Sequence, residues 1–238
     1  MGNDKLPPEK QLPPRDPENT PERLPNARDE IKKEAQKLRK GLDVEEEKIP
    51  WGKVVFDGFG KVEWDKATNK LTMAPKASTQ KRKDPKEFQE THACLVISDE
   101  KFKQPFALNY TMKTTKQLRQ NEPANNWEVG WAVFGYKDDG KFKYTMLKPE
   151  GYEMGESLLN DAQEFLDEAS DKFPINKDYK VEMKVENDTI YMSVNGRKYP
   201  PYKMVGEGKK DHLTADGKIG FYTEDAEVEV KDIKMEQL

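Results

Sequence analysis

Apolar and polar residues alternate with a period of two over most of residues 51–238. In 181–186 every second residue is apolar, and the alternation resumes in 190–194 after the turn residues Asn187 and Asp188. Successive side chains of a β-strand point to opposite faces. The pattern therefore predicts a β-hairpin with one face in water.

The same alternation recurs along the chain without interleaved helices, which predicts an all-β fold of two antiparallel sheets packed as a sandwich. One segment departs from it. Apolar residues in Ser157–Ser170 recur at helical spacing, so we expect a short helix or ordered loop across one end of the sandwich. The predicted strands are 53–56, 61–65, 70–74, 92–97, 106–113, 127–136, 142–148, 150–155, 181–186, 190–194, 217–223 and 226–236.

The first 50 residues differ from the rest of the chain. They contain eight of the 16 prolines and no Phe, Tyr or Trp, so they lack the apolar surface for a core of their own. We predict a Pro-rich charged linker at 1–25, a short amphipathic helix and connector at 26–50, and the β-sandwich at 51–238.

The predicted helix has one narrow apolar stripe, formed by Ile31, Ala35, Leu38 and Leu42. Two interpretations stay open at this point. The stripe packs on the sandwich, or it packs on another subunit and the arm mediates self-association.

Composition narrows the classes of partner. The formal net charge is −4, with 41 basic and 45 acidic residues mixed along the chain, so no basic stripe for nucleic acid is present. The single cysteine, Cys94, excludes an intrachain disulfide, and its apolar neighbours predict a buried side chain. No apolar run is long enough to span a bilayer. We expect an exported, extracellular or cell-surface protein whose signal peptide is absent from this sequence.

Four segments resemble one known group. They are NWEVGW at 126–131, LKPEGYEMG at 147–155, AQEFL at 162–166 and GFYTEDA at 220–226. They are similar to strands of LamG-like and keto-disaccharide-hydrolase-like domains of the concanavalin A-like lectin/glucanase superfamily. The resemblance covers roughly residues 54 to 236.

The resemblance implies a jelly roll of two curved sheets with carbohydrate on the concave sheet. In some members it also implies a structural Ca²⁺ ion, which needs several hard oxygen ligands. By position, the candidate ligands here are Asp57 and Asp232. No organic cofactor is expected.

Polar and aromatic residues on neighbouring strands form the candidate glycan site. The ligand-binding candidates are Glu128, Tyr136, Tyr144, Lys148 and Glu153. Aromatic rings stack on sugars, while carboxylates and Lys bind hydroxyl groups. A five-residue connection at 137–141 would bring the two strands' candidates to one face, whereas a four-residue connection would send Tyr144 and Lys148 to the opposite face. The alternative is an ordinary sheet with aromatic core residues and solvated charges.

Catalysis is left open by the sequence. A glycosidase uses two carboxylates about 5–5.5 Å apart for retention, or about 6.5–9.5 Å apart for inversion. Glucanases of the superfamily supply them from one Glu-x-Asp-x-x-Glu strand, and no predicted strand here has that order. The sequence thus favours a carbohydrate-binding or carbohydrate-processing module. The competing hypothesis is a structural, assembly or adhesion protein whose N-terminal arm makes subunit contacts.

Overall fold

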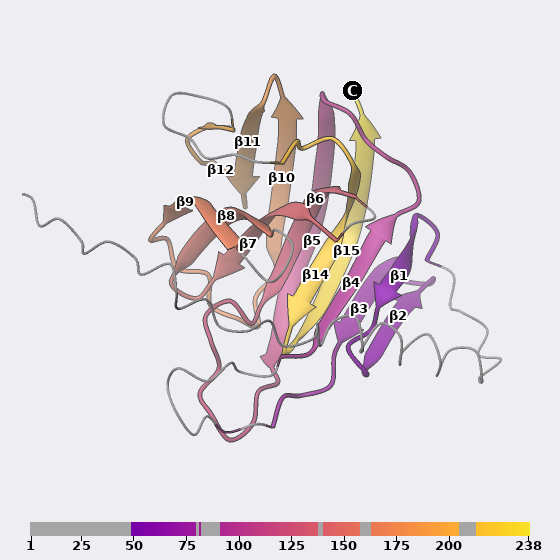
Figure 1. Ribbon diagram of the computed structural model, residues 1–238, viewed down its shortest axis with the longest axis vertical. Helices are drawn as coiled ribbons and strands as arrows, with labels where there is room; N and C mark the ends of the chain where they lie inside the picture. The colour runs from indigo at the N-terminus through magenta and orange to yellow at the C-terminus, as the bar shows by residue number, and fades with distance from the viewer. Residues whose placement is uncertain (1–48, 80, 82–90, 138–139, 158–162, 205–212) are drawn as a thin grey trace, which may run out of the picture. The chain divides into compact units, whose positions relative to one another are not determined.

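A computed structural model shows that the described chain is all-β (Figure 1). It contains fifteen strands and, within the described residues, no helix, so none of them forms a helix that could cross a membrane. The predicted linker and helix of residues 1–48 lie outside the described part. The structure describes residues 49–79, 81, 91–137, 140–157, 163–204 and 213–238.

One sheet, sheet A, has seven strands, and every neighbouring pair is antiparallel. Strands distant in sequence lie side by side in it, because β14 is inserted between β4 and β6. In spatial order the strands are β1 (Gly52–Phe56), β4 (Ala93–Ser98), β14 (Lys218–Glu224), β6 (Gly130–Tyr136), β7 (Phe142–Lys148), β8 (Gly151–Ser157) and β9 (Gln163–Ala169).

The second sheet, sheet B, is also antiparallel and has eight strands. Its central strand β5 alternates buried and half-buried residues, as a sheet with one wet face should. In spatial order the strands are β12 (Arg197–Lys198), β11 (Thr189–Val194), β10 (Tyr179–Glu186), β5 (Phe106–Gln117), β15 (Ala226–Gln237), β3 (Lys70–Ala74) and β2 (Lys61–Asp65), while β13 (Tyr202–Lys203) pairs with β11.

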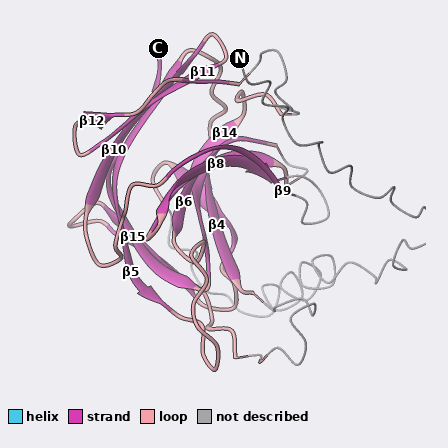
Figure 2. Ribbon diagram, turned by 90° about the vertical axis from the view of Figure 1, so that its left-hand side faces the viewer, coloured by secondary structure: helices cyan, strands magenta, loops and turns pink. Residues whose placement is uncertain are grey.

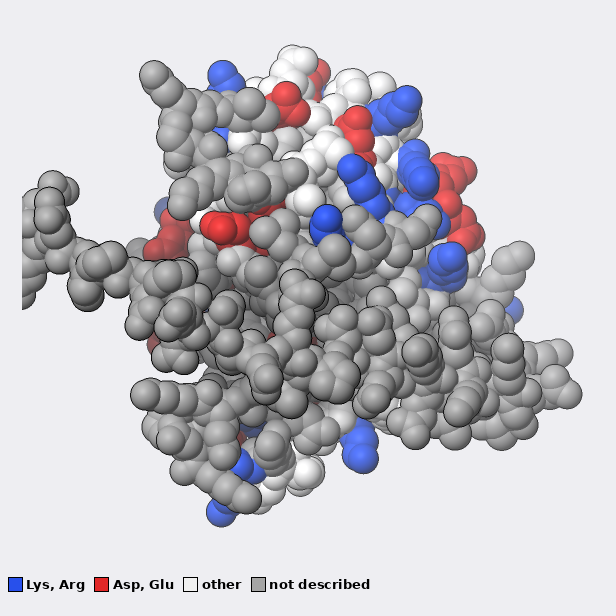
Figure 3. Space-filling model, in the orientation of Figure 1, with Lys and Arg blue, Asp and Glu red and all other residues white. Residues whose placement is uncertain are grey.

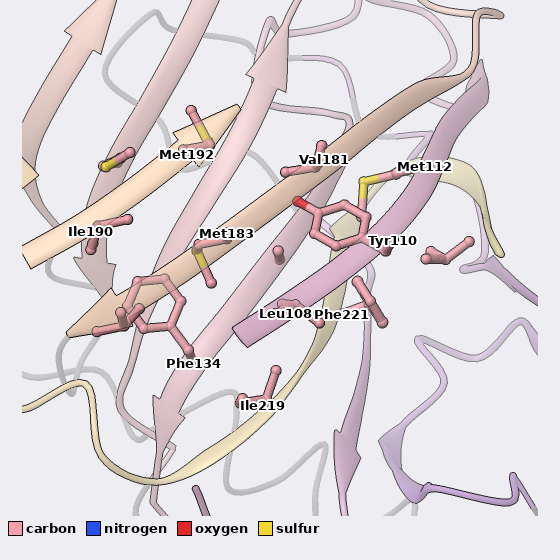
Figure 4. Packing of buried hydrophobic residues seen from close by; sticks show 14 of the residues in the cluster. Leu108, Tyr110, Met112, Phe134, Val181, Met183, Ile190, Met192, Ile219 and Phe221 are labelled. Carbon is pink, nitrogen blue, oxygen red and sulfur yellow. The ribbon is translucent and has the colours of Figure 1, made fainter. Parts of the chain in front are cut away.

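The main hydrophobic core lies between the two sheets (Figure 4). Phe134, Ile219 and Phe221 reach it from sheet A, and they meet the inner faces of β5, β10 and β11. Ile49, the first described residue, is 2% exposed and belongs to the same core. Burial of this many apolar side chains is the main stabilising contribution to the fold.

Both sheets curve in the same direction. Seen edge-on in Figure 2, β5, β10 and β15 of sheet B form the outer arc, and the strands of sheet A lie inside it. The face of sheet A that points away from sheet B is therefore the concave face of the sandwich. The predicted jelly-roll sandwich of two curved sheets is confirmed.

The helix predicted in Ser157–Ser170 is wrong for the described part of that segment. Gln163–Ala169 forms β9, which pairs with β8. The pairing gives the main chain of β8 its hydrogen-bond partners, and this outweighs a local helical spacing that contains only a few apolar residues. Of these, Phe165 is 68% exposed, so no apolar helix face is buried here.

Candidate functional site

The concave face of sheet A is apolar and aromatic, unlike the wet outer face of sheet B. Strands β6 and β8 are buried at every position, on both faces. The side chains on the concave face form a second apolar cluster, separate from the main core. Its aromatic members are Trp131, Tyr136, Phe142, Tyr144 and Tyr222.

Trp131 of β6 is the centre of an aromatic row that runs across the strands. Its ring centroid lies 4.6 Å from that of Tyr144 on β7 and 4.9 Å from that of Tyr222 on β14. Beyond Tyr222 the row continues to Phe56 of β1, at 6.3 Å. The three central rings are almost fully buried, at 0–2% exposure, and form the floor of the concave face.

Gly155 of β8 makes room for the ring of Tyr144. The two residues are opposite each other in the β7–β8 pairing. A Cβ at Gly155 would lie 2.4 Å from the Tyr144 hydroxyl oxygen and 2.8 Å from the main-chain oxygen of Glu164. The absent side chain thus lets the end of the aromatic ring lie close to the main chain of the neighbouring strand.

Polar groups line one end of this floor. The Tyr144 hydroxyl donates to Oε1 of Glu153 at 2.9 Å, and the Lys148 ammonium group donates to Oε2 of the same carboxylate. Burial, the charge and hydrogen bond of Glu153, and the charge of Glu224 raise the pKa of Tyr144. Its hydroxyl is therefore a hydrogen-bond donor to Glu153 at neutral pH.

Two exposed aromatic residues belong to segments that border the floor. Trp127, in the loop before β6, is 43% exposed, and its main-chain oxygen accepts a hydrogen bond from the indole Nε1 of Trp131 at 2.9 Å. Phe165 of β9 is 68% exposed and pairs with Gly155, so it lies on the concave side of the sheet edge. Exposed aromatic rings beside a concave surface are typical ligand contacts.

The β8–β9 side of the sheet is acidic. Glu153 and Glu168 lie opposite each other in the β8–β9 pairing, and β9 carries three carboxylates and no basic residue. Figure 3 shows acidic side chains on the side of the sandwich where Figure 1 places β8 and β9. Like charges directly opposite each other disfavour the pairing of strands.

Four of the five predicted ligand residues lie on the concave side. Tyr136, Tyr144, Lys148 and Glu153 share this face, and the connection 137–141 between β6 and β7 has the expected five residues. Strict alternation would have placed Phe134 with them, but Phe134 faces the main core. Gly135, with φ of 65°, interrupts the alternation, and the β6–β14 register shifts at this point.

Glu128, the fifth predicted ligand residue, does not face the concave surface. It precedes β6, is fully buried, and its Oε1 accepts hydrogen bonds from Arg119 Nε and from Asn125 Nδ2. Burial raises the pKa of Glu128. Sequence reasoning placed it on a strand that begins two residues later, and it missed Arg119, since no local pattern reports a partner nine residues away.

The two predicted calcium ligands are not brought together. Asp57 follows β1 of sheet A, where its Oδ1 caps a turn by accepting the Phe59 amide at 3.0 Å. Asp232 lies at an irregular position of β15 in sheet B and accepts the Thr111 hydroxyl at 2.9 Å. Within the described residues, no three His, Cys, Asp or Glu side chains are grouped as a metal site. The Ca²⁺ ion stays a prediction.

No protein family model matches the chain, and no curated protein matches it in sequence. Among solved structures, the chain is similar to the carbohydrate binding module CBM66 from Bacillus subtilis, at 12% identity with a TM-score of 0.57, covering 78% of this chain and 95% of that one. A Bacillus subtilis protein of unknown function with a galectin-like fold gives 11% identity and a TM-score of 0.51, covering 78% and 89%. A Saccharomyces cerevisiae protein of unknown function has 12% identity and a TM-score of 0.51, and the match covers 80% of this chain and 98% of that one. These likenesses show the fold alone, a jelly-roll β-sandwich.

Proposed function

We propose that the sandwich is a glycan-binding module whose ligand lies on the concave face, across β6 to β9. The observation that carries the proposal is the pair of exposed rings, Trp127 and Phe165, beside an aromatic floor that ends in the hydrogen-bonded group of Tyr144, Glu153 and Lys148. Flat aromatic rings with a few fixed polar groups suit sugar rings, which have apolar faces and polar edges. The likeness to the CBM66 module supports the proposal.

The buried and exposed residues have different roles in this proposal. The three central rings are too deeply buried to meet a ligand directly, so they form the rigid floor. Trp127 and Phe165, which are 43% and 68% exposed, supply the stacking surfaces. Lys148, with 18% of its side chain exposed, supplies a polar contact.

Binding fits this geometry better than glycoside hydrolysis. Glu153 is the carboxylate nearest the centre of the polar group, and both of its oxygens are engaged, one by the Tyr144 hydroxyl and the other by Lys148. A general acid or nucleophile needs an oxygen that faces the substrate. Glu153 is instead arranged to hold its neighbours in place.

The test is to remove each exposed ring and measure glycan affinity. We expect Trp127→Ala and Phe165→Ala to weaken binding to the strongest ligand on a glycan array by about threefold to tenfold each, the size of a single aromatic contact. Tyr191→Ala is the matched control, because Tyr191 is 44% exposed on the outer face of β11 in sheet B.

Two results would count against the proposal. The first is a wild-type protein that binds no glycan on the array. The second is a loss of affinity in Tyr191→Ala equal to that in the two concave-face variants, because binding would then not depend on the concave face.

A further inference from the structure

Arg119 lies just beyond the end of β5, and its side chain has no exposed surface. Its guanidinium group contacts two carboxylates: Nε donates to Oε1 of Glu128, and Nη2 donates to Oδ2 of Asp225 at 2.8 Å. Both carboxylate side chains are also fully buried. One buried cation therefore joins two carboxylates that belong to separate loops.

On one side, this ion pair fixes the loop that carries Trp127. Glu128 is the next residue, and its Oε1 also accepts from Asn125 Nδ2 at 2.8 Å. The main-chain oxygen of Trp127 is in turn bonded to the indole Nε1 of Trp131. Two interactions thus fix the loop: the ion pair of Glu128 with Arg119, and the hydrogen bond of the Trp127 main chain to Trp131 in the aromatic floor.

On the other side, Asp225 is a fixed anchor in the turn between β14 and β15. Its Oδ1 accepts the main-chain amides of Ser78 at 3.0 Å and His92 at 3.3 Å. Its own φ is 41°, a left-handed conformation that the turn imposes. The segments at Ser78, at His92 and at the β14–β15 turn therefore together fix the carboxylate that binds Arg119.

Stability alone is a poor reason for this arrangement. Burying charges is costly, and well-packed apolar residues often replace a buried ion pair without loss of stability. Here the second oxygen of Glu128, Oε2, is buried and makes no hydrogen bond with any described residue. What the ion pair provides, and an apolar pair would not, is a directed link between Glu128 and the anchor.

We propose that Arg119 and Glu128 are positioning residues of the glycan site, which fix the Trp127 loop against the Asp225 anchor. Neither side chain is exposed, so both act through Trp127 and not by touching the ligand. The inference rests on the proposed function for its ligand. The positioning itself can be measured without a ligand.

The experiment compares Glu128→Leu with Glu128→Gln. Glutamine keeps an acceptor oxygen for Arg119, whereas leucine has none. The first measurement is the indole Nε1–H resonance of Trp131, assigned with a Trp131→Phe variant, together with its hydrogen-exchange protection. The second is affinity for the array glycan, including the double variant Glu128→Leu with Trp127→Ala, at a temperature where circular dichroism shows each variant folded.

We expect the Trp131 resonance to shift and lose protection in Glu128→Leu but not in Glu128→Gln. Affinity should fall about tenfold in the leucine variant only, as for a lost hydrogen bond to a charged group. The double variant should bind no more weakly than Trp127→Ala alone. Glu128→Leu should also remain folded on its own; if it does not, Arg119→Lys, which reaches one carboxylate at a time, is expected to give the same resonance change.

An unchanged Trp131 resonance in the folded variants would overturn the proposal, and so would losses of affinity that add in the double variant. If the wild type binds no glycan while the resonance changes as expected, the glycan-binding function fails and the positioning of the loop stands.

Discussion

The thiol of Cys94 lies inside the sandwich, where its Sγ donates to the main-chain oxygen of Asp57 at 2.9 Å. Burial, followed by the nearby charge of Asp57, raises the pKa of this thiol. Thiolate is the reactive form. We therefore expect the native protein at pH 8 not to react with Ellman's reagent over an hour. The protein unfolded in urea should release one equivalent of thionitrobenzoate per chain. Rapid release from native protein would contradict the buried position.

The carboxyl groups of Glu128 and Asp225 should make stability depend on pH. Burial raises the pKa of both. A group whose pKa is raised on folding holds its proton longer in the folded chain, so its contribution to stability is complete below the ordinary pKa and is lost as the pH rises through the raised one. From these groups we expect the free energy of unfolding to fall as the pH rises above 4.5, the ordinary value for Glu128.

Urea unfolding at a series of pH values measures this dependence. At position 128 a glutamine cannot ionise, so Glu128→Gln should flatten the dependence of stability on pH. Glu63→Gln, at an exposed position of β2, should leave this dependence unchanged. A Glu128→Gln curve as steep as that of the wild type would show that Glu128 does not titrate in this range.

Single residues also mark the limit of what the sequence predicts. The shared face of Tyr144 and Lys148 follows from alternation, because β7 and β8 are regular strands joined by a tight turn, and Glu153 was added as a residue one strand further on. Trp131 was missed as a residue of the aromatic floor, since Gly135 shifts the alternation of β6 and assigns the wrong residues to its concave side. Tyr222 was missed because nothing in the local sequence of β14 shows that this strand pairs with β6. The sequence does not distinguish a glycine that adopts a positive φ from a glycine with the ordinary dihedral angles of a β-strand.

At the scale of the strands, β8 depends on the absence of a side chain at Gly155. Gly155→Ala would place a methyl group against the Tyr144 hydroxyl and the Glu164 carbonyl oxygen. We expect a loss of about 1–3 kcal/mol in the free energy of unfolding, typical of overpacking. Ser157→Ala, on the same strand and also buried, adds no atom and is the control. Equal stability of both variants in urea would show that Tyr144 can move aside.

Most strands could be predicted because alternation is a direct consequence of a sheet with one buried face. The strand β9 could not, because its identity comes from pairing with the edge of β8 and not from its own spacing. The start of β6 was also wrong by three residues. The loop before it is fixed by long-range bonds to Arg119 and Gln117, which no local pattern reports.

At the scale of the whole molecule, the distribution of charge should select among glycans. Glu153, Glu168 and Glu224 lie on or beside the concave face, and Lys148 is paired with Glu153. We expect neutral polysaccharides to bind and sulfated or uronic-acid polymers to bind about tenfold more weakly, because like charges repel across a partly dehydrated surface.

A charge reversal tests this selectivity. Glu168→Lys should raise affinity for the anionic polymers, while Glu182→Lys, the same change on the outer face of sheet B, should not. Equal gains in affinity for anionic polymers in both variants would show that the selectivity depends on net charge and not on the concave face.

The acidic side chains of β9 also affect how readily copies of the protein aggregate. In the described part of sheet A, β9 is the end strand, with a row of main-chain groups that another strand could join. Glu164, Asp167 and Glu168 would meet the same charges on an identical copy. This repulsion opposes edge-to-edge aggregation, and salt would screen it. A concentrated solution should therefore stay clear at low ionic strength and turn turbid as salt is added.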